Sequence, residues 1–255
     1  MSPQGSGTLE PGQVRAMFDR IAGLYDLMNT VMTAGLHHRW RARAVELAEV
    51  GPGSRVLDVA TGTGDLAAAL LEAVTPGGEV VACDFSERML ERARQKAPQI
   101  RFDWADALAL PYANGEFDAA TVGFGARNFS DLERGVAELV RVVAPGGRVV
   151  ILEITQPTRE PLASFYRGWF DRAVPALGRL AGDADAYSYL PSSVQRFPTP
   201  LELAALMERC GLRGIRYILT AGGIIALHVG EVIGTQLRSE DVPPRMAGGD
   251  SEGSV

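Results

Sequence analysis

The sequence is poor in the residues that build disulfides and metal sites. Among its 255 residues are two cysteines and three histidines. Cys83 and Cys210 each stand in an apolar stretch and form no CxxC pair, so we expect two reduced, buried thiols. The histidines at positions 37, 38 and 228 have no ligand spacing with the cysteines. We therefore expect no zinc or other metal.

Basic residues and long apolar runs are also scarce. The chain has 25 Lys and Arg against 31 Asp and Glu, a net charge of −6, which argues against electrostatically driven binding of nucleic acid. No window approaches the roughly 20 apolar residues of a membrane span, and the first 13 residues lack the apolar run of a signal peptide. We expect a cytoplasmic protein, and leave open a peripheral contact at the inner face of the membrane and a homodimer.

The pattern along the chain predicts one domain between two unstructured ends. Residues 1–12 are typical of a flexible leader and residues 236–255 of a disordered tail. The domain is expected over residues 13–235. Its first part, 13–50, is expected to be helical with a break at Gly35.

Short β-branched runs alternate with helical segments in a core at residues 54–155. Strands are expected at 55–60, 79–83, 100–104, 117–122 and 149–154, and helices at 66–74, 86–96 and 131–143. Helical segments follow at 160–198 and 200–210, and then two strands, 213–220 and 223–230, that form an antiparallel hairpin. This order predicts an α/β fold with a mostly parallel sheet, helices on both faces and a terminal antiparallel strand.

Acidic residues and glycines follow the first three predicted strands. The motif Asp58-x-x-x-Gly62-x-Gly64 ends the first strand, Asp84 ends the second, and Asp106-Ala107 follows the third. Glycines allow a ligand to approach the backbone, and an acid after the second strand can accept hydrogen bonds from ribose hydroxyls. Asp106 stands where it could accept a hydrogen bond from an adenine amino group. These residues predict a nucleoside site at the carboxyl edge of the sheet.

Two cofactors compete for this site. Gly62-x-Gly64-x-x-Ala67 also satisfies the dinucleotide pattern, which is weak by itself. Asp58 disfavours a pyrophosphate but suits the cationic sulfonium and amino group of S-adenosylmethionine. Asp106 adds a third acid, and the helical segment before the first strand is less natural in a dinucleotide domain. The pattern favours the methyl donor over a nicotinamide cofactor.

Four further stretches carry a resemblance to a known family. They are FDRIAGLYDLMNTVMTAGLHHRWR at 18–41, VLDVATGTGD at 56–65, GFGARNFSD at 123–131, and YSYLPSSVQRFP at 187–198 with TAGGIIALH at 220–228. The chain resembles the ubiquinone/menaquinone biosynthesis C-methyltransferases from about residue 14 to 230. The second stretch occurs in many methyltransferases, whereas the other three are far more specific.

The resemblance implies a class I methyltransferase fold, a Rossmann-like seven-stranded sheet that binds S-adenosylmethionine and releases S-adenosylhomocysteine. It implies donor contacts at Thr63, Asp84, Asp106, Ala107 and Gly123. Position 123 is often serine in this family, so glycine here leaves only its backbone for contact.

The resemblance also implies methylation of a ring carbon of a prenylated quinol, demethylmenaquinol to menaquinol. A ring carbon is nucleophilic only after the neighbouring hydroxyl loses its proton, so the enzyme must favour the reduced, deprotonated quinol. Our candidates for this chemistry are Arg127, Asn128, Tyr187 and His228, with Tyr189 and His37 less specific. For Arg127, an ion pair with Asp131 is the structural alternative.

Three other functions stay open. A benzoquinol of the ubiquinone route is the alternative acceptor. A nicotinamide oxidoreductase and a non-catalytic cofactor-binding scaffold protein are the alternatives of other classes.

Two segments also have open roles. The aromatic helical stretch at 161–180 could be core or could line a path for a prenyl tail, and the basic cluster at 37–43 could be a solvated face or could contact anionic lipid.

Overall fold

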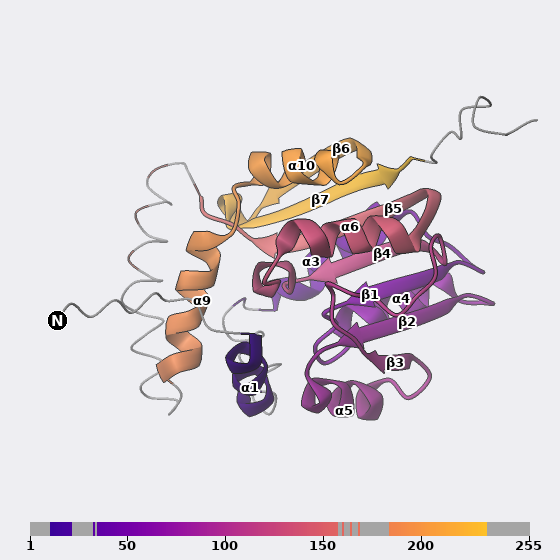
Figure 1. Cartoon of the computed structure of the whole chain (residues 1–255), viewed down its shortest axis with the longest axis horizontal. Helices are drawn as coiled ribbons and strands as arrows, with labels where there is room; N and C mark the ends of the chain where they lie inside the picture. Colours follow the sequence, from indigo (N-terminus) through magenta and orange to yellow (C-terminus); the bar gives the residue numbers. More distant parts are fainter. Residues whose placement is uncertain are drawn as a thin grey trace, which may run out of the picture.

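One seven-stranded sheet organises the chain. The computed structural model describes residues 11–21, 33, 35–157, 160, 164, 168 and 184–233. The strands are β1 (Arg55–Val59), β2 (Glu79–Asp84), β3 (Arg101–Trp104), β4 (Phe117–Gly123), β5 (Val143–Ile154), β6 (Leu212–Thr220) and β7 (Ile225–Val232). Their spatial order is β3-β2-β1-β4-β5-β7-β6, and β7 alone runs antiparallel to the other strands (Figure 1).

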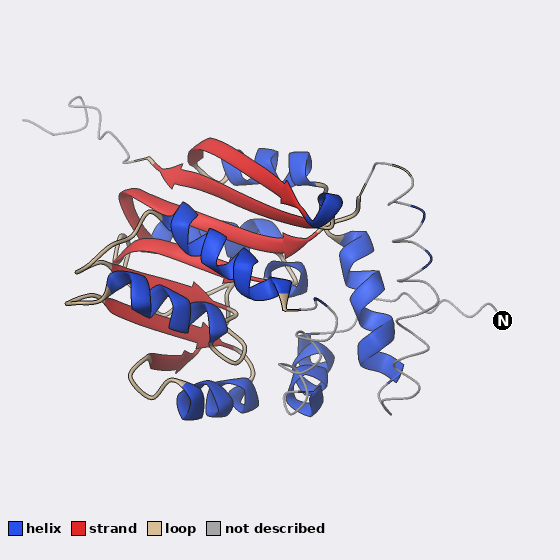
Figure 2. Cartoon of the chain, turned by 180° about the vertical axis from the view of Figure 1, so that it is seen from behind, coloured by secondary structure: helices blue, strands red, loops and turns tan. Residues whose placement is uncertain are grey.

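Helices cover both faces of the sheet. The elements are α1 (Pro11–Ile21), α3 (Leu36–Ala48), α4 (Asp65–Val74), α5 (Glu87–Lys96), α6 (Leu132–Val142), α9 (Ala184–Arg196) and α10 (Pro200–Arg209), with short 3-10 turns η1 (Ala126–Asn128) and η3 (Ala221–Gly223). Helices α3, α4 and α5 pack on one face, in front of the sheet in Figure 2, and α6 and α10 pack on the other. Helices α1 and α9 lie beyond one end of the strands (Figure 1).

Strand alternation divides the core into two layers. Leu57 and Val59 of β1 belong to the cluster under α6 and α10, whereas Val56 belongs to the cluster under α3 and α4. Because successive side chains point to opposite faces, Asp58 shares the α3–α4 side with Val56. Buried apolar surface on both faces stabilises the central parallel strands, as parallel sheets require.

The predicted fold class is confirmed, but several element ends differ from the prediction, such as those of β7, which spans Ile225–Val232 instead of 223–230. Helix α1 begins at Pro11, so the predicted leader overlaps it by two residues. Strand β5 begins at Val143 instead of residue 149, because Val143 pairs with Phe117 before the Pro-Gly-Gly turn and the ladder resumes after a register shift. The aromatic stretch, most of the predicted leader and the predicted tail lie outside the described residues.

Candidate active site

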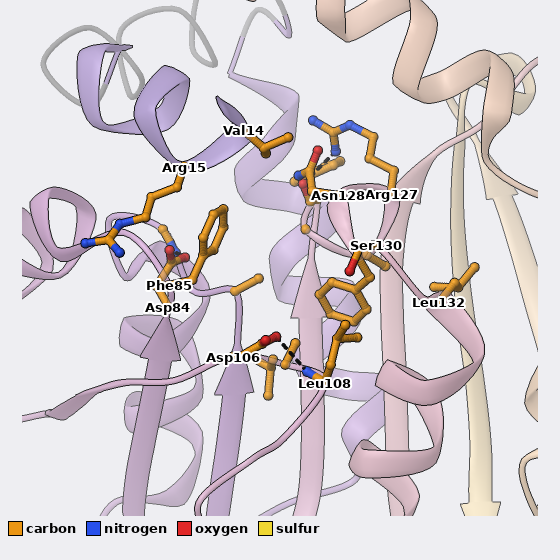
Figure 3. A pocket seen from close by; sticks show the side chains of 18 of the residues that line it. Val14, Arg15, Asp84, Phe85, Asp106, Leu108, Arg127, Asn128, Ser130 and Leu132 are labelled. Atoms are coloured by element: carbon orange, nitrogen blue, oxygen red, sulfur yellow. Dashed lines mark hydrogen bonds between the residues drawn. The ribbon is translucent and has the colours of Figure 1, made fainter. Parts of the chain in front are cut away.

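A cavity of about 690 Å³ opens at the carboxyl ends of β1, β2, β3 and β4. This size suits a drug-sized ligand, and the carboxyl edge is where open α/β sheets bind ligands. Helix α1 supplies Val14 and Arg15 on the side away from Asp106 and Leu108 (Figure 3). Tyr189 and residues 196–198 complete the wall from the α9 region. The cavity is therefore formed by strand ends on one side and by added helices on the other.

The loop after β1 forms the floor of the cavity in a strained conformation. Ala60 has a φ of 54°, although it carries a side chain, and such backbone strain is common at binding sites. Gly64 has a φ of 82° and precedes α4, and a Cβ there would lie 3.2 Å from the Phe102 ring. Gly62 lines the cavity. The glycines therefore permit the tight turn that brings backbone to the ligand.

Asp84 is the central carboxylate of this floor. Its side-chain oxygens accept hydrogen bonds from the backbone N–H groups of Gly62 and Ser86, both at 2.9 Å. Each oxygen has a second lone pair, so the carboxylate can also accept from ligand hydroxyls. Burial raises the pKa of Asp84 to about 6 from its usual value of 3.8. Asp84 lines the cavity, as a ribose-binding acid must.

Asp58 does not line the cavity. Its carboxylate is 1% exposed and accepts hydrogen bonds from the hydroxyls of Thr61 and Thr121, both at 2.6 Å. Burial raises its pKa to about 6. Asp58 therefore lies beneath the glycine loop, where it holds Thr61, and its direct contact with the donor stays a prediction.

Of the other predicted donor contacts, some line the cavity and some do not. Asp106 and Ala107 line the cavity, and Asp106 accepts a 2.9 Å hydrogen bond from the Leu108 N–H, which fixes the turn (Figure 3). Thr63, Gly64 and Gly123 are not among the lining residues. A Cβ at Gly123 would lie 3.1 Å from the Leu66 side chain on α4.

Arg127 and Asn128 lie across the cavity from Asp84 (Figure 3). The Arg127 guanidinium donates to the Glu153 carboxylate and to the Phe124 carbonyl, both at 2.6 Å. The alternative partner Asp131 is instead the N-cap of α6, where it accepts from the Arg134 N–H. Arg127 is therefore held by a carboxylate from a distant strand and not by its sequence neighbour.

Tyr189 joins this polar end of the cavity. Its hydroxyl donates a 3.1 Å hydrogen bond to the Asn128 side-chain carbonyl, and Arg196 lies 5.9 Å from its ring centroid. Burial raises the pKa of Tyr189, so the hydroxyl stays protonated at neutral pH and remains a donor. Tyr187 lies in α9, but its side chain is outside the described part of the structure.

The two histidine candidates do not line the cavity. His228 is 1% exposed, and its Nε2 lies 2.8 Å from the Pro200 carbonyl at the start of α10. Burial lowers its pKa, which suits a neutral ring that ties β7 to α10. His37 is buried at the start of α3, with Nδ1 2.7 Å from the Thr33 hydroxyl. Both rings therefore have partners within the fold, and a catalytic role for His228 stays a prediction.

Sequence reasoning missed the role of Glu153 and the place of helix α1 at the cavity wall. Glu153 interrupts the apolar run of β5, and a charge in a buried strand was the available signal. No periodicity could place Val14 and Arg15 over the cavity. Asp19 of α1 accepts a 2.6 Å hydrogen bond from Ser86, which caps α5 beside Asp84. This contact links α1 to the donor-side floor.

No group of three or more His, Cys, Asp or Glu side chains in the part of the chain that the structure describes could hold a metal ion. No helix among these residues has the length and apolar character needed to cross a membrane.

Solved structures share the fold at low sequence identity. A putative S-adenosyl-L-methionine-dependent methyltransferase from Methanococcus maripaludis is 15% identical with a TM-score of 0.60, over 93% of this chain and 99% of that one. The [4+2]-cyclase SpnF is 17% identical with a TM-score of 0.64, over 89% and 98%. These likenesses confirm the methyltransferase-type fold alone.

Sequence relatives are much closer. The demethylmenaquinone methyltransferase of Thermus thermophilus is 49% identical over 84% of this chain and 99% of its own length. The ubiquinone/menaquinone biosynthesis C-methyltransferase of Burkholderia vietnamiensis is 41% identical over 86% and 91%. The model of the ubiE/COQ5 methyltransferase family matches residues 7–232. The chain therefore belongs to the ubiE/COQ5 methyltransferase family.

Proposed function

We propose that this protein transfers a methyl group from S-adenosylmethionine to a ring carbon of a reduced prenylated quinol, converting demethylmenaquinol to menaquinol. The observation that carries the proposal is the division of one cavity into two ends. Carboxylates from β2 and the loop after β3 line one end, and the cluster of Arg127, Asn128 and Tyr189 lines the other. The names of the family relatives supply the class of acceptor.

The carboxylate end suits the donor. Asp84 would accept hydrogen bonds from the ribose hydroxyls and Asp106 from the adenine amino group. S-adenosylmethionine, when bound, supplies an electrophilic methyl group on a cationic sulfonium. The buried charge of Asp58 beneath the loop adds negative potential there, which favours a sulfonium over the pyrophosphate of a nicotinamide cofactor.

The polar end suits a phenolate. Methyl transfer to the ring requires the quinol hydroxyl to lose its proton, and a nearby guanidinium lowers the pKa of that hydroxyl. Arg127 would stabilise the anion, while Asn128 and Tyr189 would orient the ring oxygen by hydrogen bonds. Holding the ring carbon about 3–3.5 Å from the methyl group supplies the proximity that the reaction needs.

The identity of the ring rests on the relatives. Four of them, at 37–49% identity, are named for demethylmenaquinone alone, and others at 41% are named for both quinone routes. We therefore propose a naphthoquinol as the preferred acceptor and a ubiquinone-route benzoquinol as the second candidate.

A competition assay tests this preference. The protein is incubated with S-adenosylmethionine and equal amounts of both quinols, kept reduced, and the methylated products are separated by mass spectrometry. We expect methylation of the naphthoquinol at least about 10-fold faster, which corresponds to about 1.4 kcal/mol of transition-state discrimination. Equal rates would mean a dual-substrate enzyme, and faster methylation of the benzoquinol would overturn the ring assignment.

The first turn of α3 is our candidate for membrane contact, since a prenyl tail is insoluble in water. Leu36 is 41% exposed, and His38 and Arg39 are exposed beside it. The Trp40 ring packs edge-on against Phe124 of the cavity wall, with ring centroids 6.3 Å apart, so this turn lies near the site. Sedimentation with anionic vesicles should fall in R39E but not in the control R216E, and equal binding of both variants would refute this surface.

A further inference from the structure

Glu153 is a buried carboxylate beside the acceptor end of the cavity, although it does not line the cavity itself. Its side chain is 1% exposed near the end of β5. It accepts hydrogen bonds from the Arg127 guanidinium at 2.6 Å, from the Arg127 backbone N–H at 3.2 Å and from the Ile154 N–H at 2.8 Å. We propose that Glu153 is a positioning residue that fixes Arg127 for the acceptor chemistry, a role that rests on the proposed function.

The contacts hold Arg127 at both ends. Glu153 binds the backbone and the tip of the arginine, and the Phe124 carbonyl accepts a second hydrogen bond from the guanidinium. Arginine has several rotatable bonds, so an unrestrained guanidinium would sample many positions around the cavity. Because Phe124 itself lines the cavity, its carbonyl ties the guanidinium directly to the wall. The three contacts together select one placement of the positive charge.

The burial of the pair explains why both members are needed. The side chains of Arg127 and Glu153 are 8% and 1% exposed. A lone charge at this depth is strongly disfavoured, whereas a pair with additional hydrogen bonds is tolerated. An ion pair with only a structural role would not need to lie beside the residues that line the cavity. This pair instead lies beside Tyr189, whose pKa is raised mainly by burial, with Arg127 lowering it and Glu153 raising it.

Arg127 is the cavity-lining residue to which Glu153 is hydrogen-bonded. Glu153 itself is not among the lining residues, and a guanidinium does not give up its proton in proteins. Proton transfer from the quinol to Glu153 through Arg127 is therefore excluded, and orientation and electrostatics remain. Removing Glu153 should therefore lower quinol turnover mainly while Arg127 is present.

A double-mutant cycle tests the proposal with Glu153→Gln, Arg127→Gln and the double variant. Glu153→Gln should lower kcat for the quinol about 10-fold or more, with donor Kd within about two-fold of wild type. Its pH profile should move toward higher pH, like that of Arg127→Gln. When Arg127→Gln is already present, adding Glu153→Gln should lower kcat by less than about two-fold. The control Glu138→Gln breaks the Arg141 pair on α6, outside the cavity lining, and should leave kcat unchanged.

A second readout is independent of the acceptor. Hydrogen exchange of the Arg127 guanidinium protons, followed by NMR and assigned with Arg127→Gln, should be slow in wild type and fast in Glu153→Gln. Retained protection, or multiplicative losses of kcat in the double variant, would overturn the positioning role. Lost protection without quinol turnover in the wild type would support the positioning contact and refute the proposed acceptor instead. If Glu153→Gln does not fold, Glu153→Asp keeps the charge and should give intermediate exchange and kcat, whereas wild-type values would again refute the role.

Discussion

Replacing Asp84 with asparagine should weaken donor binding and change how stability depends on pH. Burial raises the pKa of Asp84 from 3.8 to about 6, a shift that corresponds to about 3 kcal/mol. Because the native-state pKa is the higher one, the folded protein binds the proton more tightly than the unfolded chain. Its contribution to stability is present below pH 3.8 and is lost as pH rises through 6.

The asparagine variant lacks this titration. Its free energy of unfolding, relative to wild type, should therefore rise by about 1.4 kcal/mol between pH 5 and pH 8, just under half of the full effect. At a fixed pH the variant also loses at least one of the hydrogen bonds from Gly62 and Ser86, because an amide has a single acceptor oxygen. The pH-dependent difference is hence more informative than either stability alone.

Donor affinity should fall in the same variant. Loss of the carboxylate leaves ribose hydroxyls with a poorer acceptor, and the expected cost is about 1–3 kcal/mol, or roughly 5- to 150-fold in Kd. Urea unfolding at several pH values and calorimetric titration with S-adenosylhomocysteine measure both effects. Asp118 lies near the amino end of β4, away from the cavity, so Asp118→Asn is the control and should leave the donor Kd unchanged. An unchanged Kd, or a stability difference that is flat from pH 5 to 8, would refute the reasoning.

Two other substitutions test the walls of the cavity. A Cβ at Gly125 would lie 2.5 Å from the Ala60 Cβ, so Gly125→Ala should cost about 1–3 kcal/mol in urea unfolding by forcing the two loops apart. The control Gly51→Ala meets nothing within 4 Å and should stay within about 0.5 kcal/mol of wild type; equal effects would show that the loops do not touch. Tyr189→Phe removes the hydrogen bond to Asn128 and should lower kcat for the quinol roughly 10-fold with unchanged donor Kd, about 1.4 kcal/mol. A matching loss of donor affinity would move Tyr189 out of the acceptor end.

The sheet could be predicted because short sequence patterns determine its strands and turns. β-Branched runs and turn glycines each act within a few positions, and Ser86 and Asp131, the first residues of two predicted helices, cap α5 and α6. Asp84 and Asp106 could be placed at the cavity because parallel strands share one carboxyl edge. Successive side chains of a strand point to opposite faces of the sheet. Asp58, one residue before the end of β1, therefore faces α3 and α4.

Long-range partners could not be predicted in this way. Arg127 pairs with Glu153, 26 residues away, and the competing Asp131 is closer in sequence but occupied as a helix cap. Helix α1 is tied to the floor of the cavity by the hydrogen bond from Ser86 to Asp19, 67 residues away. Such contacts follow from the packing of complete elements, which periodicity and spacing do not specify.

The most direct test of the account is the position of the transferred methyl group. The protein is incubated with S-adenosylmethionine carrying a deuterated methyl group and with reduced demethylmenaquinol, and the product is analysed by mass spectrometry and NMR. We expect one deuterated methyl on the ring carbon and no transfer to the oxidised quinone. A label on oxygen, transfer to the quinone, or no transfer despite intact binding of S-adenosylhomocysteine would contradict it.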